Sequence, residues 1–102
     1  MDLDHEFIFE KFHEAMDIHT RLFKLLRKNG FVTYADLCYM LREDCSIDFP
    51  DRYFNIGWDN LFYSKVEPTD EYINGKWILI LPKPKTLNFK KIFEHVFLVK
   101  LL

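Results

Sequence analysis

The chain has 102 residues, of which 49% are apolar, 18% aromatic and 29% charged. A chain of this length can bury one hydrophobic core but not two, and its aromatic content excludes a disordered or collagen-like polypeptide. Its net charge of −2 lacks the basic excess typical of a duplex-binding module. We therefore expect one compact domain covering residues 1–102.

The sign of the charge alternates along the sequence. Residues 1–20, 21–30, 31–75 and 76–102 carry net charges of −5, +4, −6 and +5. Folding can turn such alternation into a surface with an acidic middle and a basic end, which favours a charged macromolecular partner. The acidic N-terminus is unlike a targeting signal, and no apolar run reaches the roughly 18 residues that span a bilayer. Because two cysteines give no disulfide framework, we expect a cytoplasmic protein.

Two helices are predicted in the N-terminal part. Apolar residues recur at helical spacing from Ile8 onwards and predict the first helix. This helix is predicted to end at Asn29–Gly30, where the glycine is typical of a left-handed helix end. A second helix is predicted to begin at Thr33, because Asp36 three residues later gives the spacing of a capping box. The acidic stretch Arg42–Pro50 that follows is predicted to be a surface loop.

The middle of the chain predicts a short or broken third helix and then a hairpin. The third helix would lie in Pro50–Tyr63, interrupted at Gly57. Strands are predicted at Lys65–Glu67 and Tyr72–Leu81, with a tight turn at Asn74–Gly75. The second strand is apolar on both faces, so we expect it to be covered on both sides or to lie at an interface.

The C-terminal part predicts a stiff connector, Pro82–Lys85, and a last helix capped by Asn88. The fold class is therefore α+β, with N-terminal helices, a β-hairpin and a C-terminal helix in the element order of a winged helix. The apolar end must dock against something. We expect it to form a homodimer through Phe97, Leu98 and Leu101.

No residue pattern predicts an enzyme. His19 lies in the apolar stripe of the first helix, and neither Ser46 nor Ser64 has the sequence context of a nucleophile elbow. Cys38 is interpreted as a small core residue, and Cys45 lies in an acidic loop that disfavours a thiolate. We therefore expect no catalytic site, no cofactor and no metal ion, and keep a small hydrolase around His19 as a third hypothesis.

Our first hypothesis is a non-enzymatic protein–protein interaction protein with an acidic surface. Carboxylates in the middle of the chain can substitute for phosphates in a basic site of a nucleic-acid-handling host protein. The partner-binding residues that we expect are Glu43, Asp44, Asp48, Asp51, Tyr53, Phe54, Trp58, Asp70 and Glu71.

The alternative hypothesis is a winged-helix-like regulator that binds DNA. Its recognition helix would be Pro50–Tyr63, whose net charge of −1 argues against this function. Contacts to the DNA backbone would come from Lys83, Lys85, Lys90 and Lys91.

Three patterns, at Val32–Leu37, Gly57–Leu61 and Gly75–Pro84, together resemble small uncharacterised proteins of bacterial phages and mobile elements. The resemblance covers about residues 18–84 and implies no known activity. Small acidic proteins of such genomes often bind and block a host protein, and anti-CRISPR proteins are one such group. By this analogy the resemblance favours an inhibitor of a host protein.

Overall fold

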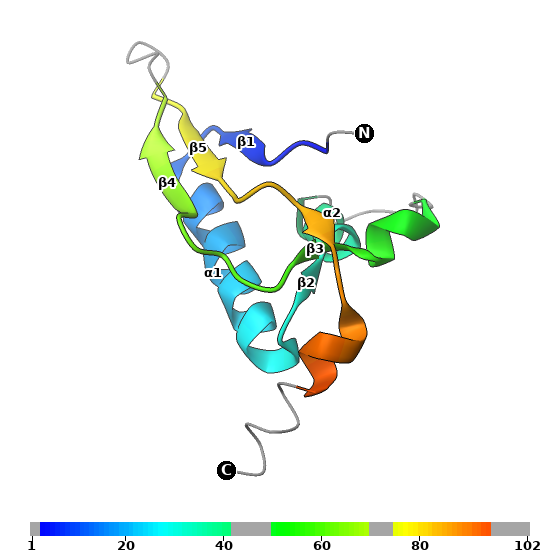
Figure 1. Ribbon diagram of the computed structural model, residues 1–102. Helices are drawn as coiled ribbons and strands as arrows, with labels where there is room; N and C mark the ends of the chain where they lie inside the picture. Colours follow the sequence, from blue (N-terminus) through cyan, green and yellow to red (C-terminus); the bar gives the residue numbers. More distant parts are fainter. Residues whose placement is uncertain (1–2, 42–49, 70–74, 95–102) are drawn as a thin grey trace.

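The computed structural model describes residues 3–41, 50–69 and 75–94 (Figure 1). The chain is α+β, as the sequence predicted. Its elements are β1 (Glu6–Phe9), α1 (Phe12–Asn29), β2 (Val32–Thr33), α2 (Tyr34–Leu41), the 3-10 turn η1 (Asp51–Phe54), β3 (Ile56–Trp58), β4 (Lys65–Pro68), β5 (Trp77–Ile80) and β6 (Lys85–Thr86). Residues 89–94 are helical as well.

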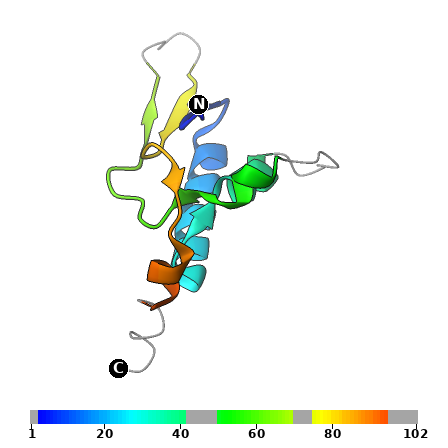
Figure 2. The same ribbon diagram turned by 45° about the vertical axis from the view of Figure 1, so that its right-hand side comes forward.

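The strands form two small antiparallel sheets, ordered β1-β5-β4 and β2-β3-β6. One face of the first sheet packs against α1, and the second sheet joins α1 to α2. In Figures 1 and 2, helical residues 89–94 lie beside the C-terminal end of α1. One core connects these parts, and its residues include Ile18, Leu22, Val32, Leu37, Trp58, Leu61, Leu79 and Leu81.

The predicted end of the first helix and the predicted start of the second helix are both confirmed. Gly30 adopts φ 82° after α1, and its N–H donates to the Leu26 carbonyl at 2.7 Å. At the start of α2, the Thr33 N–H donates to Asp36 Oδ2 and the Asp36 N–H donates to Thr33 Oγ1, both at 3.0 Å. Each of these pairs satisfies backbone groups that the helix itself leaves unbonded.

The expected start of the first helix near Ile8 is wrong. Residues Glu6–Phe9 form strand β1, which pairs with β5, and α1 begins only at Phe12, without a side-chain cap. Phe7 lies opposite Leu79 and Phe9 opposite Trp77, so this strand contributes aromatic side chains to the core face of the sheet. The spacing of Ile8 and Phe12 fits a helix equally well, and the pairing with β5 decides between the two conformations.

The predicted short or broken third helix is confirmed only at its start, where Asp51–Phe54 form the short 3-10 helix η1. Its residues form the single turn η1 and then strand β3, in which Gly57 lies opposite Thr33 of β2. A Cβ atom at Gly57 would collide with the Val32 carbonyl, so the glycine permits this close approach of two backbones. The described residues therefore lack the recognition helix of a winged helix, and strand β1 precedes the first helix.

The predicted hairpin is confirmed in its two arms, β4 and β5, which are antiparallel. The Thr69 N–H donates to the Lys76 carbonyl at 3.1 Å, and Gly75 has φ 60°, while residues 70–74 lie outside the described part. Of the predicted connector Pro82–Lys85, residues 82–84 have no regular structure, but Lys85 belongs to strand β6 (Lys85–Thr86). Asn88 caps the last helix, because its Oδ1 accepts the Lys91 N–H at 3.1 Å.

The described residues contain no helix that is both long and apolar enough to cross a membrane. Of the predicted acidic loop Arg42–Pro50, only Pro50 is described, because residues 42–49 lie outside the described part of the chain. Residues 97–102 lie outside it as well. The homodimer through Phe97, Leu98 and Leu101 therefore stays a prediction.

Replacement of Gly57 by alanine tests the close packing of β3 on β2. We expect Gly57→Ala to lower the free energy of unfolding by about 3 kcal/mol, because the added methyl group must displace the Val32 backbone. Gly75→Ala is the control: its methyl group meets open space, and its positive φ limits the loss to about 1 kcal/mol. Urea denaturation measures both, and equal losses would contradict the packing.

Candidate interaction surface

A tight turn at Leu61–Ser64 carries two exposed aromatic side chains. Leu61 is buried, whereas Phe62 is 71% exposed and Tyr63 is 96% exposed. The Ser64 N–H donates to the Leu61 carbonyl at 3.2 Å, which closes the turn. Among the described residues other than glycine, Tyr63 is the one with a positive φ, 67°. A positive φ at the third residue is the pattern of a type II turn, where glycine or asparagine is usual.

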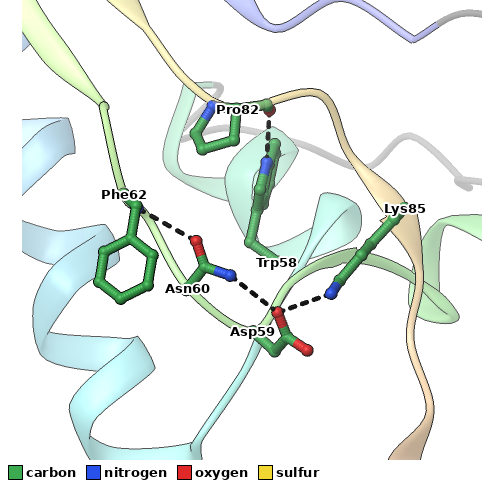
Figure 3. A network of polar contacts seen from close by, with 6 residues as sticks. All are labelled: Trp58, Asp59, Asn60, Phe62, Pro82 and Lys85. Carbon is green, nitrogen blue, oxygen red and sulfur yellow. Dashed lines mark hydrogen bonds and ion pairs between the residues drawn. The ribbon is translucent and has the colours of Figure 1, made fainter.

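Polar contacts and a buried tryptophan fix the chain on the N-terminal side of this turn (Figure 3). Trp58 is 2% exposed, and its indole Nε1 donates to the Pro82 carbonyl at 2.6 Å. Lys85 Nζ lies 2.9 Å from Asp59 Oδ1, which also accepts a hydrogen bond from Asn60 Nδ2 at 3.3 Å. The Phe62 N–H in turn donates to Asn60 Oδ1 at 3.2 Å. The turn therefore leaves the core in a fixed direction.

A histidine and a serine fix the other side of the turn. Ser64 Oγ lies 2.9 Å from His19 Nε2 of α1 and 2.7 Å from the Leu61 carbonyl. The serine hydroxyl has one hydrogen, which it donates to the carbonyl, so it accepts the hydrogen bond from His19 Nε2–H. A histidine that activates a serine must accept the serine proton instead. With the serine proton on the carbonyl, this pair holds the turn against α1.

A hollow of about 410 Å³ lies next to the aromatic turn. It lies between the end of α1, at Gly30, the Asp59–Phe62 segment and the start of the last helix. Its lining is mostly apolar, with Phe62 and Ile92 among the apolar side chains and Lys91 on the polar side. Its size and lining suit an apolar side chain of another molecule.

The two basic segments of the sequence meet at one end of the molecule. Phe31, which follows α1, packs edge to face against Phe89 and Phe93, with ring centroids 5.1 and 5.9 Å apart. This packing brings the last turn of α1 beside helical residues 89–94 (Figures 1 and 2). We call this region the basic end, and its exposed cations are Arg27, Lys28, Lys90 and Lys91.

Most of the acidic residues that we expected at a partner surface lie outside the described residues. Of these carboxylates only Asp51 is described, and it is exposed on η1. The others lie outside the described residues, and they are Glu43, Asp44, Asp48, Asp70 and Glu71. Their clustering into one acidic surface stays a prediction.

The three aromatic residues expected beside these acids differ in how far their side chains are exposed. Phe54 is exposed. Tyr53 is half-buried, with its ring edge to face against Tyr34 at 5.0 Å. Trp58 is buried in the core, so the expectation that it is exposed is wrong. Its hydrogen bond to Pro82 explains the burial, because the polar N–H of the indole has a partner there.

The lysines of the DNA-binding hypothesis do not form a single row. Lys83 is exposed in the connector, and Lys85 pairs with Asp59. Lys90 and Lys91 belong to the basic end. Among residues 3–41, 50–69 and 75–94, no three histidine, cysteine, aspartate or glutamate side chains come close enough to hold a metal ion.

Comparisons of the chain with protein-family models, curated proteins and solved structures gave no match. The resemblance to phage and mobile-element proteins therefore stays a prediction.

The pH dependence of stability tests the burial of His19. Burial lowers the pKa of His19 below its ordinary value, because the imidazolium is poorly solvated beside Phe23 and Ser64. The unfolded chain then binds the proton first as the pH falls. The contribution of neutral His19 to stability is therefore complete above the ordinary histidine pKa and is lost below it.

We expect the free energy of unfolding to decrease between about pH 7.5 and 5.5, and His19→Gln to remove part of this slope. His13→Gln is the control, since His13 is exposed on the same helix. Urea denaturation at a series of pH values measures the slope. A slope that His19→Gln leaves unchanged would contradict the burial argument.

Proposed function

We propose that this chain is a non-enzymatic protein that binds another protein through the Leu61–Ser64 turn. The observation that carries the proposal is Tyr63, a large aromatic residue that is 96% exposed and has φ 67°. The left-handed conformation costs a non-glycine residue about 1–2 kcal/mol. An exposed ring contributes almost nothing to the core, so Tyr63 costs stability without stabilising the fold. Such strain is typical of sites of function.

The contacts around the turn support its use in recognition. The His19–Ser64 hydrogen bond holds one side, and the Asp59–Lys85 pair with Asn60 holds the other. A turn that is fixed before binding loses little conformational entropy when a partner binds. Tyrosine is also enriched among the energetically dominant residues of protein interfaces, and phenylalanine is enriched in interfaces generally.

The hollow beside the turn gives the partner a place to insert an apolar side chain. Phe62 forms part of its wall, so the exposed ring of Tyr63 and the hollow can act as one surface. Lys91 lines the same hollow, and the basic end lies next to it. A partner segment with an apolar anchor and nearby carboxylates matches this surface.

The proposed binding site at the Leu61–Ser64 turn differs from the acidic surface that the sequence predicted. The acidic surface around Asp51 and Phe54, and inhibition of a host protein by it, remain a second version of the same function class. The two versions predict different sensitive residues, namely Tyr63 in one and Phe54 with Asp51 in the other.

The basic end favours a candidate function of another class, which is binding of a single-stranded nucleic acid. Exposed aromatic rings next to lysines and arginines are also the composition of proteins that bind single-stranded nucleic acids. Phe62 and Lys91 line the same hollow, and Tyr63 and Phe93, which follow them in the chain, are exposed, so this candidate has a surface to test.

Two substitutions at Tyr63 separate its role in folding from its role in binding. We expect Tyr63→Gly to raise the free energy of unfolding by about 1 kcal/mol, because glycine accepts a positive φ. Tyr63→Ala removes the ring but keeps the strain, so its stability should stay within about 0.5 kcal/mol of the parent chain. Thermal or urea denaturation measures both values.

Affinity capture from a host-cell lysate then tests binding with the same two variants. We expect one protein to be retained by the parent chain and by Phe54→Ala, and to be lost with both Tyr63 variants. Retention by the Tyr63 variants with loss in Phe54→Ala would move the site to the predicted acidic surface. Retention by all variants would contradict the proposal.

A salt titration decides between a protein and a single-stranded nucleic acid. A labelled oligonucleotide is added at about 50 mM salt, and fluorescence anisotropy is followed as salt increases. If the chain binds protein alone, the anisotropy stays at its free value. Binding that falls steeply with salt and is lost in Lys90→Glu/Lys91→Glu, but not in Lys11→Glu, would favour the nucleic-acid candidate.

A further inference from the structure

Strand β1 has an open edge in the part of the chain that the structure describes. It is an outer strand of the β1-β5-β4 sheet, with β5 on one side and no described strand on the other (Figure 1). The backbone N–H and C=O groups on such an edge can pair with a strand of another molecule. Several classes of protein bind extended segments of their partners in this way.

The pairing with β5 shows which backbone groups of β1 point to the open edge. The Leu81 N–H donates to the His5 carbonyl at 2.9 Å, which makes these two residues a hydrogen-bonded pair. Hydrogen-bonded and non-hydrogen-bonded pairs alternate along an antiparallel ladder, so Phe7 also bonds to β5. The N–H and C=O groups of Glu6 and Ile8 therefore point away from β5, to the open edge.

The opposite edge of the sheet, along β4, is better protected. The Thr69 N–H donates to the Lys76 carbonyl at 3.1 Å, so the same alternation directs the backbone of Val66 and Pro68 to that edge. Proline has no N–H and is typical of protected edge strands. Within β4 only Val66 then directs an N–H to the edge, whereas β1 directs two.

The side chains beside the β1 edge are acidic around one exposed isoleucine. Phe7 packs against the core, so the alternation of side chains places Glu6 and Ile8 on the outer face of the sheet. Ile8 is 64% exposed and gains burial when another strand covers it. Glu6 is exposed and forms no ion pair with the described residues. Glu10, just after the strand, is 75% exposed and lies 3.9 Å from Lys76 Nζ.

We propose that an extended basic segment of a partner protein adds to β1 as a further antiparallel strand. Its backbone pairs with the N–H and C=O groups of Glu6 and Ile8. Paired residues lie about 5.5 Å apart and share a face, so a lysine or arginine opposite Glu6 meets a carboxylate. An apolar residue two positions along covers Ile8, and a second basic residue reaches Glu10. The recognised pattern is a basic, an apolar and a basic residue at alternate positions.

Charge is the reason for choosing a basic partner. If β1 paired with β1 of a second copy, the outer-face residues Glu6, Ile8 and Glu10 of the two copies would lie side by side. This set contains no cation, so carboxylates would come close to carboxylates and repel. A basic segment replaces this repulsion by attraction. Residues 1–20 have a net charge of −5, which also favours the approach of a basic segment.

This edge is independent of the proposed binding site at the Leu61–Ser64 turn. The turn lies beside the basic end and favours a partner segment with carboxylates, whereas the β1 edge favours a segment with cations. A basic peptide therefore does not compete for the turn, and failure of one proposal leaves the other in place.

Two peptides of equal charge test the edge. The first has the sequence Thr-Lys-Thr-Val-Thr-Lys-Thr with blocked ends, and the second carries methyl groups on the backbone nitrogens of its lysines and valine, which would face β1. Each is titrated into the isotope-labelled full chain up to about 1 mM and followed by NMR. We expect the first peptide to move the amide resonances of Glu6 and Ile8 and to slow their hydrogen exchange. The methylated peptide should do neither, because it cannot donate the backbone hydrogen bonds.

Two variants of matched charge test the role of Glu6. Glu6→Lys should lower the affinity for the first peptide about tenfold or more, because a carboxylate opposite the peptide lysine becomes a cation. Glu14→Lys makes the same charge change at an exposed position of α1 and should leave the affinity within about twofold. Circular dichroism verifies that both variants keep the fold.

Four results would overturn the proposal. They are no binding of the first peptide at about 1 mM, equal binding of the methylated peptide, resonance changes at Val66 in place of Glu6 and Ile8, and an equal loss of affinity in the two variants. Slow exchange at Glu6 and Ile8 without peptide, together with a dimer in sedimentation equilibrium, would also overturn it, since a second copy would then occupy the edge.

Discussion

The burial of Trp58 is the constraint on which most of the structure depends. Its indole fills the centre of the core, and burial of the indole N–H requires an acceptor, which the Pro82 carbonyl provides at 2.6 Å. Trp58 also lies opposite Val32 in the β2–β3 pairing. One side chain thus connects the second sheet to the connector that follows the hairpin, and it fixes the point where the Asp59–Phe62 segment leaves the core.

The signals that the sequence carries locally were predicted well. The capping box of α2 involves residues three apart, and Gly30 needs only its own chain to end α1. The two arms of the hairpin were predicted for the same reason, since their alternation and turn lie within a short stretch. Local interactions are decided by nearby residues, and they can be found in one sequence.

The wrong predictions involve partners that are distant in the chain. Strand β1 exists because it pairs with β5, which lies about 70 residues later, and its residues fit a helical pattern as well. The same holds for Gly57, whose role comes from the approach of Val32 and Thr33 rather than from its neighbours. No periodicity analysis contains this information, because it depends on which segments meet after folding.

The candidate site was predictable only in part, for the same reason. His19 and Ser64 were each noticed as separate residues, but only the fold brings them to 2.9 Å, and there the hydrogen-bond direction suits support of a turn. The turn itself had no signal, since Leu61–Ser64 lacks the glycine, proline or asparagine that usually marks one. Trp58 was expected among the partner-binding residues, whereas the structure buries it in the core.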